Sequence, residues 1–194
     1  RRRPDGRVKI LDFGLAKVIG TGISSPHEAD TTRIGLGSGG QVSTAWGTAE
    51  RAQWLSRQRK LRSYTEDVVT RIQRLAAFDA QEYGQVDYPP DHYRLLALRS
   101  RAPRDDRPWV LVTGGVHGYE TSGVHGALQF LEQHAAGYPV NLLAVPCVSP
   151  WAYERIHRWN ANAVDPNRSF REGGAAEESA ALLRLVAPLR GRFL

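Results

Sequence analysis

The sequence predicts an α/β protein in which strands and helices alternate from about residue 47 onward. Residues 108–113 and 140–148 are short, nearly continuous apolar runs, which are typical of buried strands. Helix-like segments follow these runs at 121–134 and 177–186. Such alternation indicates a layered domain in which helices pack on a β-sheet.

The other elements follow from local signals in chain order. Residues 7–11 alternate like a short strand, and residues 20–44 are rich in Gly, Ser and Thr, which indicates a loop or linker. Helices are predicted at 47–62 and from Ser63, where the S-x-x-E spacing matches a capping box. A further strand is expected at 93–98. The second helix has one apolar face that requires a core to cover it: Val68, Val69, Ile72, Leu75 and Ala76.

Composition and charge exclude several classes of protein. Hydrophobic residues make up 41% of the 194 residues and charged residues 24%, which are values typical of a globular chain. No apolar run is long enough to span a bilayer, and no secretory signal is visible, so we expect a cytoplasmic protein without a membrane partner. The net charge of +6 comes from scattered arginines that alternate with acids, so we expect no nucleic-acid partner. Cys147 is the single cysteine, which excludes an intrachain disulfide, and its apolar neighbours predict that it is buried.

The two ends of the sequence suggest a cut chain. It contains no methionine, and residues 191–194 read as the first residues of an apolar strand. We therefore expect that the sequence is truncated at both ends.

Residues 8–17 read V-K-I-L-D-F-G-L-A-K, which resembles the D-F-G segment of protein serine/threonine kinases. That resemblance implies a magnesium-ligand role for Asp12. The Gly-rich nucleotide loop, the V-A-I-K lysine and the H-R-D catalytic loop of that family are absent from the sequence. We therefore expect that Asp12 has no function in this chain, that the chain binds no nucleotide, and that residues 1 to about 45 contact the rest little.

A second motif follows the first buried strand. His117 and Glu120 form an H-x-x-E sequence where that strand ends and a helix begins. Imidazole nitrogen and carboxylate oxygen are zinc ligands, and a catalytic zinc needs three protein ligands and a water. Loops at the carboxyl ends of buried strands are where α/β folds place ligands.

Residues 158–170 read R-W-N-A-N-A-V-D-P-N-R-S-F, which resembles the segment R-x-N-x-x-G-V-D-x-N-R-x-F of the zinc carboxypeptidases. Together with H-x-x-E, in that order and separation, this segment resembles the zinc carboxypeptidase superfamily, which includes the succinylglutamate desuccinylase and aspartoacylase deacylases. The resemblance covers about residues 47–194. It implies a mixed β-sheet flanked by helices, incomplete at the C-terminus.

The resemblance also implies roles for five residues. His117 and Glu120 match the first two zinc ligands, and Arg158 matches the arginine that polarises the scissile carbonyl. Asn167 and Arg168 match the pair that grips the free carboxylate of the substrate. The chemistry suits these roles, because the planar guanidinium fork pairs with carboxylates and zinc polarises carbonyls. The implied substrate is a peptide C-terminus or an acyl-amino acid with a free carboxylate.

The sequence departs from that pattern in several places. Ala163 replaces the usual Gly, and residues 149–152 replace N-P-D-G. The third zinc ligand and the general base have no matching position. His125 and His134 fit no ligand position, and we expect His157, next to Arg158, to lie at the surface or outside the ligand set. We therefore expect zinc with two of its three ligands, and no activity of the isolated chain.

The sequence predicts three segments: a kinase-like fragment at 1–20, a linker at 21–46, and the N-terminal part of a zinc carboxypeptidase-like domain at 47–194. The expected activity of the parent protein is hydrolysis of an amide bond next to a free carboxylate. An N-acyl amino-acid deacylase, a kinase fragment and an inactive binding module remain as alternatives.

Overall fold

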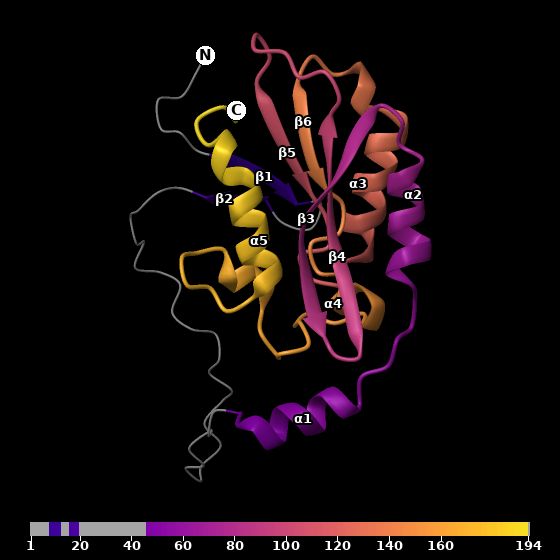
Figure 1. Cartoon of the computed structure of the whole chain (residues 1–194), viewed down its shortest axis with the longest axis vertical. Coiled ribbons are helices and arrows are strands. Elements are labelled where there is room, and N and C mark those ends of the chain that lie inside the picture. The colour runs from indigo at the N-terminus through magenta and orange to yellow at the C-terminus, as the bar shows by residue number, and fades with distance from the viewer. Residues whose placement is uncertain (1–7, 13–15, 20–45, 194) are drawn as a thin grey trace.

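The computed structural model describes residues 8–12, 16–19 and 46–193, which build one mixed β-sheet with helices on both faces (Figure 1). The order of its strands is β2-β1-β5-β6-β4-β3. Their bounds are β1 (Val8–Asp12), β2 (Ala16–Ile19), β3 (Phe78–Tyr88), β4 (Asp91–Ser100), β5 (Trp109–Thr113) and β6 (Asn141–Val145).

The sheet combines parallel and antiparallel pairs. β1, β5 and β6 run parallel, whereas β4 is antiparallel to β6 and forms a hairpin with β3. A β-bulge between Glu82 and Gly84 interrupts the register of that hairpin. The predicted mixed α/β fold is therefore confirmed.

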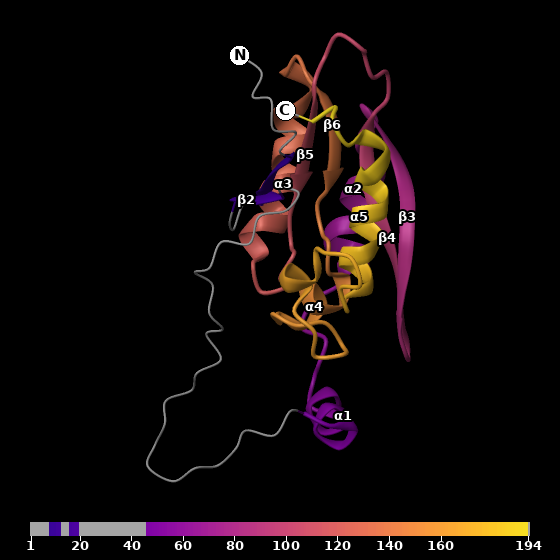
Figure 2. The ribbon, with the colours of Figure 1, turned by 90° about the vertical axis from the view of Figure 1, so that its left-hand side faces the viewer.

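The helices flank the sheet. In Figure 1, α5 lies to one side of the central strands, α2 and α3 lie to the other, and α1 lies at the lower end of the molecule, where Figure 2 also shows it. The helices are α1 (Thr48–Ser56), the π-helical turn η1 (Thr65–Val69) that continues into α2 (Thr70–Gln73), α3 (Thr121–Gln133), α4 (Pro150–Arg155) and α5 (Glu177–Val186). Short 3-10 turns stand at η2 (Ala135–Gly137), η3 (Pro166–Ser169) and η4 (Ala187–Leu189).

Two apolar cores occupy the two faces of the sheet. Along β6, Leu142 and Ala144 belong to the core under α3, whereas Leu143 and Val145 belong to the core under α5. Successive side chains of a strand point to opposite faces, so a strand between two helical layers must be apolar throughout. This requirement explains the continuous apolar runs of β5 and β6.

Most elements of the domain lie where the sequence predicts them. The exceptions are β2, β3 and α4, which the sequence did not predict, and α1, which ends at Ser56 instead of extending to residue 62. The buried and exposed residues of β3 do not alternate regularly, and the β-bulge between Glu82 and Gly84 interrupts the two-residue period that indicates a strand. Cys147 is buried as predicted, and burial raises the pKa of its thiol.

The expectation that residues 1 to about 45 contact the rest little is wrong for β1. The strand pairs in parallel with β5, with Ile10 opposite Leu111 and Asp12 opposite Thr113. The edge of β5 offers unpaired backbone groups, and an alternating apolar segment can satisfy them. Asp12 therefore lies in a strand of the sheet, while most of the predicted linker, residues 21–45, lies outside the described residues.

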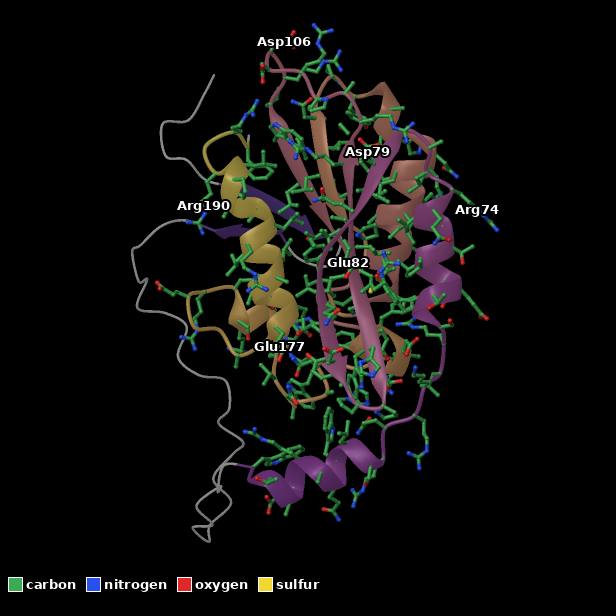
Figure 3. The ribbon with its side chains drawn as sticks, in the orientation of Figure 1. Arg74, Asp79, Glu82, Asp106, Glu177 and Arg190 are labelled. Carbon is green, nitrogen blue, oxygen red and sulfur yellow. The ribbon has the colours of Figure 1, made fainter. Side chains whose placement is uncertain are left out.

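Charged side chains of both signs occupy the outside of the molecule, as the labelled residues of Figure 3 show: Arg74, Asp79, Glu82, Asp106, Glu177 and Arg190. None of the helices in the described ranges has the length and apolar character needed to cross a membrane.

Candidate functional site

The candidate site begins in the loop that follows β5. This loop carries His117, which is 3% exposed, and Glu120, which is the N-cap residue of α3. The loop packs closely on α4, because a Cβ atom added to Gly118 would lie 1.9 Å from the carbonyl carbon of Ala152. Glycine is therefore required at this position, and the sequence brings the H-x-x-E segment directly against another helix.

The His117 imidazole lies between two carboxylates. Its Nδ1 is 2.9 Å from Glu120 Oε1, and its Nε2 is 2.9 Å from Asp165 Oδ1. Burial by itself lowers the pKa of His117, but the hydrogen bonds to Asp165 and Glu120 outweigh it and raise the pKa above 6.5. Each ring nitrogen of His117 thus lies within hydrogen-bond distance of one carboxylate oxygen.

Asp165 is the residue on which the second motif converges. Its Oδ2 accepts hydrogen bonds from Arg158 Nε at 3.0 Å and lies 2.9 Å from Arg158 Nη2, and Arg168 Nε is 3.5 Å away. Its Oδ1 also accepts from the backbone N–H of Asn167 at 3.0 Å. Burial alone raises the pKa of Asp165, but the hydrogen bonds from His117 and Arg158 lower it to about 2.

A buried amide shapes the loop between Arg158 and Asp165. Asn160 Oδ1 accepts from the backbone N–H groups of Asn162 and Val164, each at 3.1 Å, and Asn160 Nδ2 donates to Glu178 Oε2 at 3.3 Å. Within this loop Ala163 has φ of 56°, in the left-handed region where glycine is favoured. The carboxypeptidase motif has Gly at this position, and the positive φ explains why. This chain has Ala163 there instead.

The structure thus brings four of the predicted residues together: His117, Arg158 and Arg168 contact Asp165, and Glu120 contacts the other nitrogen of the His117 ring. Asn167 joins the cluster through its backbone N–H. The side chains of Arg158 and Arg168 are 39% and 71% exposed. The roles that the sequence resemblance implies for these five residues remain predictions.

Two residues of this cluster were missed by the sequence analysis. Asp165 belongs to the V-D-x-N-R segment, and its position two residues before the Asn-Arg pair is the sequence feature that points to it. Tyr119 lies inside H-x-x-E, where an aromatic residue gave no signal of its own. Its ring stacks on His117 with centroids 5.6 Å apart, and its hydroxyl accepts from Arg158 Nη1 at 3.3 Å.

The three spare histidines have other neighbours. His125 contacts Arg71 and the hydroxyl of Tyr153, and His134 is an exposed residue at the end of α3. His157 lies against Trp54 and Trp151. Among the described residues, no group of three or more His, Cys, Asp or Glu side chains is arranged to hold a metal ion.

The residues present nevertheless suit part of a metal site. Glu120 Oε2 is buried and has no hydrogen-bond partner among the described residues, while the other oxygen of this carboxylate lies beside His117 Nδ1. One imidazole nitrogen and one carboxylate could therefore serve as two ligands. Asp165 lies on the opposite nitrogen of the ring, which is where an outer carboxylate orients a metal-binding histidine.

The chain is similar in structure to solved metallopeptidases. No protein-family model and no curated protein matches it. A proposed metallopeptidase from Shewanella denitrificans OS217 is 29% identical, with a TM-score of 0.55 over 66% of this chain and 48% of that one. A proposed metallopeptidase from Shewanella baltica OS155 is 28% identical, with a TM-score of 0.54 over 64% and 48%.

A metallo-carboxypeptidase from Burkholderia cenocepacia shares the fold at 18% identity, with a TM-score of 0.53 over 64% of this chain and 37% of that one. The chain thus has a carboxypeptidase-like α/β fold. It spans about half the length of the Shewanella proteins.

Proposed function

We propose that the chain is part of a zinc-dependent hydrolase that cleaves an amide bond next to a free carboxylate, as a metallocarboxypeptidase does. The observation that carries this proposal is the buried Glu120 Oε2, which lacks a hydrogen-bond partner among the described residues and belongs to the carboxylate beside His117 Nδ1. The Shewanella structures, which are described as proposed metallopeptidases, support it. A cytoplasmic location remains a prediction of the sequence.

In this proposal His117 and Glu120 are two of the three zinc ligands. Zinc would supply Lewis-acid polarisation of the carbonyl and a water that is acidic near neutral pH. Asp165 holds the His117 ring through Nε2, so that Nδ1 faces Glu120. With two ligands, the chain should bind zinc no tighter than about micromolar and should hydrolyse no peptide or acyl-amino acid.

The arginines would bind the substrate. Arg158 directs Nε and Nη2 to Asp165, which leaves Nη1 on the side of Tyr119 to polarise the scissile carbonyl. The terminal nitrogens of Arg168 make no hydrogen bond with the described residues, and its exposed guanidinium can pair with a free carboxylate. Asn167 lies next to it and would complete that carboxylate site.

The test is a zinc titration of the chelator-treated protein by calorimetry. We expect weak, saturable binding that His117→Ala abolishes, because it removes one of two donors. His134→Ala is the control, since it removes an exposed histidine at the end of α3. Binding that survives His117→Ala, or stoichiometric zinc that resists dialysis, would contradict the two-ligand proposal.

A further inference from the structure

Arg62 connects the H-x-x-E loop to α4 through three acceptors. Its Nη2 donates to the carbonyl of Gly118 at 2.5 Å, and its Nη1 donates to Thr121 Oγ1 at 2.7 Å. Its Nε donates to the carbonyl of Tyr153 at 2.6 Å, and its guanidinium lies 3.8 Å from the centroid of the Tyr153 ring. One side chain therefore holds both flanks of the dipeptide Tyr119–Glu120.

Arg62 is itself firmly attached to α4. The backbone N–H groups of Leu61 and Arg62 both donate to the carbonyl of Glu154, at 2.8 and 3.3 Å. The backbone N–H of Tyr64 donates to Glu154 Oε1 at 3.0 Å. The guanidinium thus acts from a fixed backbone, and a planar fork with several donors loses little entropy when it binds fixed acceptors.

The other hydrogen bonds of Tyr119, Glu120 and Thr121 are mostly local: the N–H groups of Thr121 and Gly123 donate to the carbonyls of Tyr119 and Glu120, at 2.9 and 3.0 Å. The backbone N–H of Glu120 donates to the carbonyl of His117 at 3.2 Å. The backbone N–H of Tyr119 donates to the carbonyl of His157, also at 3.2 Å. Among the described residues, the Glu120 carboxylate forms a hydrogen bond only with His117. The separation of His117 and Glu120 therefore depends on where Gly118 and Thr121 are held.

We propose that Arg62 is a positioning residue of the metal site, which sets the geometry of His117 and Glu120 by fixing the loop that carries them. The inference rests on the proposed function, because it assigns those two residues to a metal. The hydrogen bonds of Arg62 to this loop go to the backbone of Gly118 and the hydroxyl of Thr121, so it acts on His117 and Glu120 through these neighbours.

Arg62→Lys tests the proposal, because one ammonium group keeps the charge but cannot reach three acceptors. We expect zinc binding about tenfold weaker, which is the low end of the loss seen when outer contacts of a metal site are removed. We also expect faster hydrogen exchange of the Tyr119 and Glu120 amides in the metal-free protein. Thr121→Val removes one acceptor only, and should change both measurements in the same direction by a smaller factor.

Arg71→Lys is the matched control. Arg71 also makes three side-chain contacts, with both oxygens of Glu132 and with His125, but they reach α3 instead of the loop. Arg71→Lys should lower the melting temperature without changing zinc binding or the hydrogen exchange of the loop amides. Unchanged loop exchange in both Arg62→Lys and Thr121→Val would overturn the inference, as would equal losses of zinc binding in Arg62→Lys and Arg71→Lys.

The two proposals fail in different ways. If the wild-type chain binds no zinc while Arg62→Lys still speeds exchange of the loop amides, the proposed function is wrong and the positioning of the loop stands. If the wild type binds zinc through His117 and Arg62→Lys binds it equally well, the proposed function stands and the role of Arg62 is wrong.

Discussion

Asp165 carries the densest set of charged contacts of the candidate site. One imidazole and two guanidinium groups face its carboxylate, which is only 9% exposed. The pKa of Asp165 is lowered to about 2, because His117 and Arg158 stabilise the ionised carboxylate by more than burial destabilises it. The orientation of the His117 ring and of Arg158 thus depends on one side chain.

Asp165→Asn should lower the free energy of unfolding by about 3 kcal/mol at pH 7, since it removes the charged partner of a largely buried ion pair. Urea unfolding followed by fluorescence measures the change. Asp106→Asn is the control: Asp106 pairs with Arg104 through two hydrogen bonds, but both side chains are exposed. Asp106→Asn should leave stability almost unchanged. Equal effects of the two substitutions would contradict the conclusion that the ion pairs of Asp165 stabilise the fold.

At the scale of elements, the loop after β5 and helix α4 form one packed unit. The loop approaches the middle of α4, at Ala152 and Tyr153, so closely that no side chain fits at Gly118. Arg62 joins the same two elements from a third segment. The H-x-x-E segment is therefore positioned by contacts with α4, beyond the local geometry of its own turn.

Gly118→Ala should destabilise the fold by about 3 kcal/mol, at the upper end of the usual cost of overpacking. The added methyl group would overlap the backbone of Ala152 and Tyr153, neither of which can rotate away. The comparison is Gly137→Ala, where nothing lies within 4 Å of the added atom, and which should be close to neutral. Thermal unfolding of the two variants decides the matter, and a neutral Gly118→Ala would show that the loop and α4 are not in contact.

At the scale of the whole molecule, Glu178 joins three parts of the chain. It is 1% exposed near the start of α5, and its Oε2 accepts from Tyr88 of β3 at 3.1 Å and from Asn160 of the site loop at 3.3 Å. Burial raises the pKa of Glu178 above 4.5, with hydrogen bonds from Asn160 and Tyr88 acting in the opposite direction. The helix, the sheet edge and the loop therefore meet at a buried carboxyl group whose pKa is raised.

Stability should consequently fall as Glu178 ionises. With a folded-state pKa above the unfolded value, the group contributes stability below about pH 4.5 that is lost as pH rises through the folded pKa. Glu178→Gln should therefore gain stability relative to wild type between pH 4 and pH 8, as measured by urea unfolding at each pH. Glu177→Gln, on the exposed side of the same turn, controls for the loss of a negative charge. If the difference in unfolding free energy between Glu178→Gln and wild type did not change with pH, the argument would be wrong.

The sequence by itself determined the α/β class, the buried strands β5 and β6, the helices α3 and α5, and the grouping of His117 with Glu120. Each of these features is local. An apolar run reports burial on both faces of a strand, and residues three apart at a strand–helix junction share one loop whatever surrounds them. The motif order also indicated which arginines belong near that loop.

Only the tertiary structure decided the rest. β3 gains its place from pairing with β4, although its own pattern is irregular, and β1 gains its place from the open edge of β5. Arg62 lies 56 residues from Gly118, and Asp165 lies 48 residues from His117. Contacts over such separations depend on how the chain folds back on itself, and no pattern within a few residues encodes that path.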